Sequence, residues 1–410
     1  MTERRAPHRL GPRPLPMHLG LAMWQVTSSS VALPLSSKGW TGWKPPLAAR
    51  AAALQSELAA ANPEALGRAV TVEGLRHLER LLSGIEQYRR HPWRRDVTDP
   101  PAVWTEGSSA LRDYGGVGPA VLFVPSLINK SYILDLSERH SLLRWLAGQG
   151  VNPWLLDWGH PGDIERRFTL DDYVAGRLVR AFDAVAELTG GPVTVAGYCM
   201  GGLLALALAR LRAERIKGLA LLATPWDFHA GDGARAQALA ATLPLLEPQL
   251  SLFGALPVDS LQMLFAGLDP FGIQRKFEAF AELQPDSARA TLFVALEDWL
   301  NDGVPLAAPV ARECIQGWYG ENRPAKGRWV IAGRPVRPDL LNIPAIALIP
   351  VKDRIVPPES AEALAAALPA CQRVDVEAGH IGMVVGSGMK ESVWTVLRDW
   401  IAAVQKYTTG

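Results

Sequence analysis

The most constraining feature of this sequence is the five-residue turn Gly197-Tyr198-Cys199-Met200-Gly201, which joins an apolar, β-branched run (residues 192–196) to an apolar helix expected over residues 202–209. A turn this tight strains the backbone of its central residue, and a glycine on each side avoids clashes with the adjoining strand and helix. Motif and context together predict a nucleophile elbow with Cys199 as the nucleophile. The alternative is a buried cysteine at a Gly-rich strand–helix junction.

Strands and helices alternate on both sides of this elbow. Helices are expected over residues 139–147 and 170–188, the second beginning at a Thr169 cap. Strands are expected at residues 120–124, 151–158, 193–196, 218–223, 345–349 and 373–376. This alternation predicts an α/β fold built on a mostly parallel sheet with helices on both faces. With the elbow, it predicts an α/β-hydrolase fold.

The chain divides into four expected regions. Residues 1–100 form an N-terminal extension, disordered over residues 2–16 and helical over 46–61 and 64–87. Residues 101–225 are the first part of the core and open with a hairpin of residues 103–106 and 110–114. Residues 226–338 are an inserted helical cap, with helices over 234–245, 260–265 and 273–283. Residues 339–410 complete the core, with helices over 359–367 and 391–404.

Composition narrows the function classes. The chain has 410 residues, of which 48% are hydrophobic and 20% charged, with a formal net charge of +1. That charge gives no field favouring nucleic acid or an anionic membrane. Three widely spaced cysteines, Cys199, Cys314 and Cys371, predict neither a disulfide framework nor a metal site. No secretory signal or membrane span is recognised, so we expect a cytoplasmic protein.

Two N-terminal features leave alternatives open. Trp24, Trp40 and Trp43 stand among small residues, where they could dock on the body of the protein or on an apolar surface. Four arginines interleaved with aromatic residues over 88–95 could meet an anionic group, although a solvated surface turn is favoured.

An elbow nucleophile needs a base, an orienting acid and oxyanion donors. His380, in the loop Gly379-His380-Ile381-Gly382 after the last strand, is the predicted base rather than an ordinary packing residue. Asp353, just after the strand at 345–349, is the predicted acid. A helix cap, or a pair with Arg354, is its alternative role, and Asp227 is the rival acid. The predicted oxyanion donors are the backbone N–H groups of Met200 and of the loop residues Leu127 and Ile128.

The choice of cysteine has a chemical consequence. Exchange of one thioester for another is nearly balanced in free energy, so an acyl group on Cys199 stays activated for a later alcohol acceptor. A thiolate is also a strong nucleophile near neutral pH. The sequence therefore favours acyl transfer from a thioester over simple hydrolysis.

With these residues placed, the chain resembles the polyhydroxyalkanoate synthase family. The resemblance rests on residues 123–136, 197–202, 297–303, 353–360 and 379–382, in that order along the chain. It implies Cys199 as acyl carrier, His380 as base and Asp353 as supporting acid beneath a mobile cap. It implies (R)-3-hydroxyacyl-CoA as substrate and a growing polyester as product, with coenzyme A released and no cofactor or metal. It also allows a homodimer, a second synthase subunit and association with polyester granules.

Two competing interpretations remain at this stage. The same Cys-His-Asp triad could serve an α/β-hydrolase acting as a thioesterase, esterase or polyhydroxyalkanoate depolymerase. A non-enzymatic granule or scaffold protein could also retain the fold, although the complete triad argues against it.

Overall fold

The computed structural model describes residues 9–37, 43, 45–386 and 388–406, and the chain forms two compact units. The first unit joins the N-terminal residues up to 94 with residues 265–301, and the second comprises residues 95–264 and 302–410. Residues 265–301, part of the segment for which a cap was expected, are therefore compact with the N-terminal helices.

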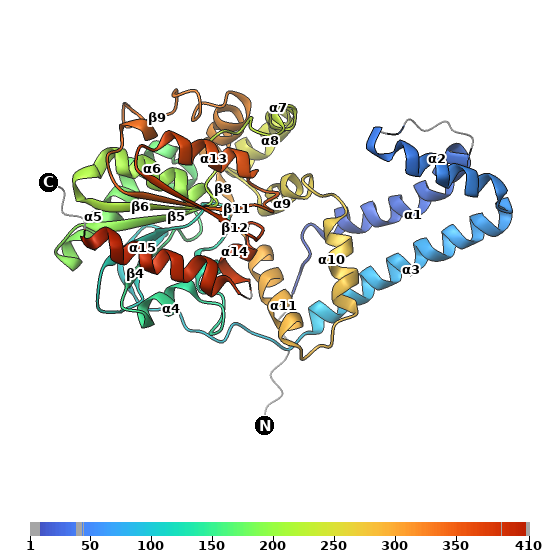
Figure 1. The fold of residues 1–410 in the computed structure, drawn as a ribbon, viewed down its shortest axis with the longest axis horizontal. Coiled ribbons are helices and arrows are strands. Elements are labelled where there is room, and N and C mark those ends of the chain that lie inside the picture. Colours follow the sequence, from blue (N-terminus) through green and yellow to red (C-terminus); the bar gives the residue numbers. More distant parts are fainter. Residues whose placement is uncertain (1–8, 38–42, 44, 387, 407–410) are drawn as a thin grey trace. The chain divides into compact units, whose positions relative to one another are not determined.

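The second unit is built on an eight-stranded sheet with strand order β1-β2-β4-β3-β5-β6-β11-β12 (Figure 1). Its strands are β1 (Ala102–Glu106), β2 (Ser109–Asp113), β3 (Ala120–Val124), β4 (Asn152–Asp157), β5 (Val193–Tyr198), β6 (Ile216–Leu222), β11 (Ala345–Pro350) and β12 (Cys371–Val376). The β1–β2 hairpin adds to β4 in antiparallel fashion, and the remaining neighbours are parallel. The expected α/β-hydrolase sheet is confirmed.

Helices cover both faces of this sheet because its central strands are apolar on both sides. Every residue of β3, β5 and β11 is buried. Figure 1 shows α6 on one side of β5 and β6 and α15 on the other. The helices flanking the strands are α4 (Leu142–Gly148), α5 (Val179–Thr189), α6 (Met200–Arg212), α13 (Pro358–Ala367), α14 (Gly382–Val385) and α15 (Thr395–Lys406). The buried side chains of α5, α6 and α13 pack with those of the strands in the main hydrophobic core.

Helical segments at several of these positions are wound differently from ordinary α-helix. Two π-helical stretches, η3 (Asp172–Leu178) and η7 (Lys390–Trp394), precede α5 and α15. The predicted Thr169 cap is present, because the Asp172 N–H donates to Thr169 Oγ1 and the Thr169 N–H donates back to Asp172 Oδ2. Short 3₁₀ turns are η1 (Ser131–Leu134), η2 (Glu165–Arg167), η4 (Ala213–Arg215) and η6 (Pro338–Leu340).

Between β6 and β11 the second unit carries a mainly helical region. It contains α7 (Gly233–Ala240), α8 (Leu243–Phe253), α12 (Ala308–Arg312) and the π-helix η5 (Glu313–Gly320). The helix α9 (Val258–Ala266) ends at the boundary between the two units. Two small ribbons, β7 (Ala255–Leu256) with β8 (Leu306–Ala307) and β9 (Val330–Ile331) with β10 (Arg334–Pro335), lie in the same stretch.

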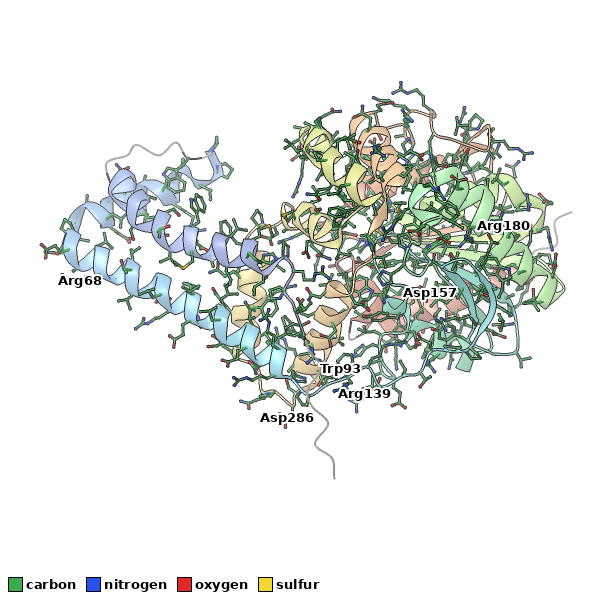
Figure 2. All side chains as sticks on the ribbon, turned by 180° about the vertical axis from the view of Figure 1, so that it is seen from behind. Arg68, Trp93, Arg139, Asp157, Arg180 and Asp286 are labelled. Atoms are coloured by element: carbon green, nitrogen blue, oxygen red, sulfur yellow. The ribbon has the colours of Figure 1, made fainter. Side chains whose placement is uncertain are left out.

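The first unit is helical. Its helices are α1 (Leu15–Ser37), α2 (Pro45–Ala60), α3 (Pro63–Arg90), α10 (Gly272–Ala281) and α11 (Ala288–Asn301). Tyr88 and Leu81 of α3 pack with Phe277 and Phe280 of α10 in a separate hydrophobic cluster. Gly84 allows this close approach, because a Cβ there would stand 2.1 Å from the Phe277 carbonyl oxygen. Arg68, near the N-terminal end of α3, is exposed (Figure 2).

Two N-terminal expectations need correction. Disorder over residues 2–16 is wrong for residues 9–16, because the Arg9 guanidinium is buried and bonds the Asp298 carboxylate at 2.6 and 2.9 Å. The remaining residues of that segment, and Trp40, lie outside the described residues. No helix was expected over α1, whose side chains Trp24 and Met23 are exposed.

The arginines of residues 88–95 mostly bond the protein itself. Arg89 donates to the carbonyl oxygens of Leu10 and Gly11, Arg90 pairs with Glu86, and Arg95 pairs with Asp99 and Asp135. The favoured interpretation of this run, a solvated surface turn, is wrong: residues 88–90 are the last turn of α3, residues 91–95 follow it without regular structure, and Tyr88 and His91 are buried.

Candidate active site

The elbow has the backbone geometry that its sequence predicts. Cys199 lies between β5 and α6 with φ 56° and ψ −128°, a conformation that L-residues rarely adopt. A Cβ on Gly197 would lie 2.4 Å from the Gly202 Cα, and one on Gly201 would lie 2.0 Å from the Val124 carbonyl oxygen. Glycine is therefore required at both positions by backbone contact, and Cys199 is held at the carboxyl end of the central strand.

The structure brings Asp353 and His380 together across 27 residues. Asp353 follows β11 and His380 follows β12, and these two strands are parallel neighbours in register from Ala345↔Cys371 to Pro350↔Val376. The His380 Nδ1 lies 2.6 Å from the Asp353 Oδ2, and both side chains are buried. The other carboxylate oxygen, Oδ1, accepts the backbone N–H groups of Ile355 at 2.8 Å and Val356 at 3.0 Å.

This arrangement gives each Asp353 oxygen a separate function. Oδ1 closes the turn of residues 353–356 and does not cap α13, whose N-cap is Pro357 with no side-chain cap bond, and Oδ2 faces the imidazole. Contact with Asp353 through Nδ1 leaves Nε2 of His380 for other partners. Both the turn role and the orienting role are thus compatible in one carboxylate.

Cys199 lies close enough to His380 to influence its pKa, so the three predicted side chains belong to one site. Burial lowers the pKa of His380, but the negative charges of Cys199 and Asp353 and the hydrogen bonds to both residues outweigh it and raise that pKa to about 10. Both neighbours of His380 thus favour the protonated imidazole.

The rival carboxylate, Asp227, has different partners. Its Oδ1 accepts the backbone N–H of His229 at 2.9 Å and the Asn322 amide at 2.7 Å. The Asn322 Oδ1 in turn accepts the N–H of Phe228. Asp227 therefore ties the segment after β6 to the residues after η5, whereas Asp353 is the carboxylate in contact with His380.

The predicted oxyanion loop lies directly against the elbow. The Gly201 backbone packs on the carbonyls of Val124 and Pro125, because a Cβ there would lie 2.0 and 2.7 Å from their oxygens. Trp158 Nε1 donates to the Pro125 carbonyl at 3.0 Å. The Ile128 N–H donates to Ser126 Oγ at 3.2 Å, and the Leu127 side chain is buried. Met200 is the first residue of α6, so its N–H is at the positive end of the helix dipole.

Sequence reasoning missed two tyrosines beside the nucleophile. The Tyr198 hydroxyl donates to the His380 backbone carbonyl at 3.0 Å, and the two rings lie 5.2 Å apart. Burial and the charge of Cys199 raise the pKa of Tyr198 and of Tyr319. Tyr198 stands inside the elbow motif, but no spacing indicates its contact with a residue 182 positions later.

The other two cysteines lie in environments that suppress thiolate formation. Burial raises the pKa of Cys314 well above its usual range and that of Cys371 to about 11. Cys199 alone among the three stands on an elbow beside a histidine.

Among the described residues, no helix is long and apolar enough to cross a bilayer.

The amino-acid sequence is similar to those of a known family and of several named proteins. The sequence model of the α/β hydrolase fold family matches residues 119–387. A poly(3-hydroxyalkanoate) polymerase subunit from Haloarcula marismortui is 28% identical over 68% of this chain, and the match spans 60% of that relative. The corresponding subunit from Synechocystis sp. is 29% identical over 81% of this chain and 93% of its own length. The resemblance expected from the sequence is confirmed.

Solved structures include a thermophilic esterase from Thermogutta terrifontis. It aligns with a TM-score of 0.46 and 19% identity, covering 75% of this chain and 98% of its own.

Proposed function

This chain belongs to the α/β-hydrolase fold family, and from that premise we propose that it is a polyhydroxyalkanoate polymerase acting through a Cys199 acyl-enzyme. The observation that carries the proposal is the cysteine elbow in contact with a buried His380–Asp353 pair. The relatives that match most of the chain are named poly(3-hydroxyalkanoate) polymerase subunits, which supports a 3-hydroxyacyl unit as the monomer. The cysteine nucleophile favours a thioester donor, so we propose the coenzyme A thioester of that monomer as the substrate.

In the first step, the Cys199 thiolate attacks the thioester carbonyl carbon of the substrate. The carbonyl π pair moves to oxygen, and collapse of the tetrahedral intermediate breaks the carbon–sulfur bond to coenzyme A. Protonated His380 gives its proton to the leaving thiolate, so free coenzyme A and the Cys199 thioester are the products. The raised pKa of His380 supports this acid role, because it favours the imidazolium form near neutral pH.

In the second step, neutral His380 takes the proton of a 3-hydroxyl group. The resulting alkoxide attacks the carbonyl carbon of an acyl thioester. An ester bond forms, the carbon–sulfur bond breaks, and the sulfur leaves as a thiolate while His380 keeps the proton. Asp353 holds the imidazole with Nδ1 toward itself, so that Nε2 is the nitrogen exchanging protons in both steps. A thioester intermediate keeps the acyl group reactive until the hydroxyl group that accepts it arrives.

The oxyanion of either intermediate needs two backbone donors. We assign one to Met200, the first residue of α6. We assign the second to Leu127 rather than Ile128, because the Ile128 N–H already donates to Ser126 Oγ.

Incubation with (R)-3-hydroxybutyryl-CoA tests the proposal. We expect release of coenzyme A together with polyester, and peptide mass spectrometry should find a hydroxyacyl group on the peptide carrying Cys199. Acyl labelling remains a valid readout if elongation needs a second subunit, as the subunit names of the relatives suggest. Cys199→Ala should abolish both.

Two results would contradict polymerisation. Coenzyme A release with monomeric hydroxy acid as the sole product would indicate a thioesterase. Shortening of preformed oligomers without coenzyme A would indicate a depolymerase. Cys199→Ser is the matched variant, since it keeps the triad geometry but forms an oxygen ester; strong hydrolysis by it would argue against the need for a thioester carrier.

A further inference from the structure

Residues 302–304, which we call the strap, run beside the loop that follows β3. Gly303 forms an antiparallel β-bridge with Asn129, and the Val304 N–H donates to the Ile128 carbonyl at 2.9 Å. The two segments are more than 170 residues apart in the sequence, and both belong to the second unit. The strap is therefore a short added edge on the loop.

Side chains reinforce this backbone contact. The Asp302 carboxylate pairs with Lys130 Nζ at 3.2 Å and accepts the Tyr132 hydroxyl at 3.4 Å. Gly303 and Val304 are buried, whereas Asp302 is 46% exposed. The strap thus contacts residues 128–132 through two backbone and two side-chain interactions.

The opposite edge of the same loop is fixed independently. Gly201 of the elbow packs on the carbonyls of Val124 and Pro125, and Trp158 donates to Pro125. Leu127 lies between the two fixed ends. The peptide that joins Leu127 to Ile128 is bound through the Ile128 N–H, and the next peptide is bound through the Ile128 carbonyl. Neither peptide can rotate without breaking its contact, which restricts the backbone on the carboxyl side of Leu127.

We infer that the strap positions the Leu127 N–H as an oxyanion donor, with Asp302 as its positioning residue. The inference rests on the proposed attack of Cys199 on an acyl carbonyl, since that attack is what forms the oxyanion. Positioning matters because a donor displaced by about 1 Å loses most of its transition-state stabilisation.

Three variants test the strap. Asp302→Ala removes the ion pair and the tyrosine contact, and Val304→Pro removes the N–H that bonds Ile128. Asp339→Ala is the matched control, because Asp339 is 45% exposed and paired with Arg337 within the same unit. Asp302→Ala keeps the test decisive if Val304→Pro does not fold.

We expect both strap variants to speed amide hydrogen exchange in peptides covering residues 125–130 by about tenfold. The kcat for coenzyme A release should fall about tenfold or more, with KM changed less than about twofold, because only transition-state contacts are lost. Alkylation of Cys199 by iodoacetamide should stay within about twofold of wild type, because that reaction forms no oxyanion. The control should change none of these quantities.

Unchanged exchange and unchanged kcat in the strap variants would overturn the inference. A parallel fall in alkylation would also overturn it, because the whole site would then be disturbed. A wild-type chain that releases no coenzyme A would contradict the proposed function. Hydrogen exchange would still decide whether the strap holds the loop, and turnover of a chromogenic acetate ester would supply the kcat comparison.

Discussion

Replacing Asp353 by asparagine tests whether Asp353, rather than Asp227, is the carboxylate that orients His380. The Asp353 Oδ1 accepts two backbone N–H groups, so the amide oxygen of the asparagine must stay on that side. The amide nitrogen, a donor, would then face His380 Nδ1 in place of Oδ2. Nδ1 must become an acceptor, which places the imidazole proton on Nε2, the nitrogen that should receive the proton of Cys199 or of a hydroxyl group.

The consequence is a histidine of the wrong tautomer in unchanged geometry. We expect kcat for coenzyme A release to fall about 10³- to 10⁴-fold, which corresponds to about 4 to 5.5 kcal/mol of transition-state free energy. Iodoacetamide alkylation of Cys199 near neutral pH should slow as well, because the imidazolium loses the charge that supports it.

Asp227→Asn is the matched control. Asp227 bonds Asn322 and the His229 backbone rather than His380, so activity should stay within about threefold of wild type. The reasoning is refuted if Asp353→Asn retains a tenth of the wild-type kcat, or if Asp227→Asn loses as much activity as Asp353→Asn does.

Three further outcomes follow from contacts described above. Gly201→Ala should lower the free energy of unfolding by about 1 to 3 kcal/mol, whereas Gly148→Ala, with no atom within 4 Å of its new methyl group, should not lower it; equal denaturation midpoints would contradict this. Cys199→Ala should lower the pKa of His380 from about 10, as read from an NMR titration of the imidazole. The folded-state pKa of His380 lies above its ordinary value of 6.5, so the stability that its protonation adds is complete below pH 6.5 and is lost as the pH rises toward 10. The variant should lose this stability at a lower pH than the wild type does. An unchanged imidazole titration would exclude the thiolate as the cause of the raised pKa. Arg9→Ala should destabilise the first unit by about 2 to 4 kcal/mol in denaturant unfolding, since it strands a part-buried carboxylate; intact stability would show that the N-terminal contacts contribute nothing.

Much of the fold of the second unit could be predicted because its signals are local. The strand β3 has the expected bounds, since five consecutive apolar residues end at a proline. The placement of Cys199, Asp353 and His380 at one edge of the sheet could be predicted because each follows a strand where parallel strands present their carboxyl ends. For these residues, sequence position alone determines spatial position once the sheet is assumed.

Other elements carry no such local signal. The helix α1 has a Ser/Thr-rich stretch and a proline near its end, which weaken any helical pattern, and its Thr27 and Ser29 hydroxyls bond carbonyls one turn back. The π-helix η5 has the same apolar periodicity as an ordinary helix. The grouping of residues 265–301 with α3 depends on contacts such as Gly84 against Phe277, which no spacing in the sequence indicates.

The same distinction applies within the candidate site. Tyr198 reaches the His380 carbonyl, and the strap reaches Asn129, across long sequence separations and through backbone groups. Backbone donors and acceptors are common to almost every residue, so they leave no trace in the amino-acid pattern.

The contact between Asp353 and His380 depends on the correct pairing of β11 with β12. Asp353 lies three residues beyond Pro350, and His380 lies four beyond its partner Val376, yet their side chains meet at 2.6 Å. A slip of one residue between these strands would displace one side chain by about 3.3 Å relative to the other and turn the strand faces over. Misassembled chains would therefore be inactive even when compact and helical, and turnover per molecule would count the correctly paired fraction of a preparation.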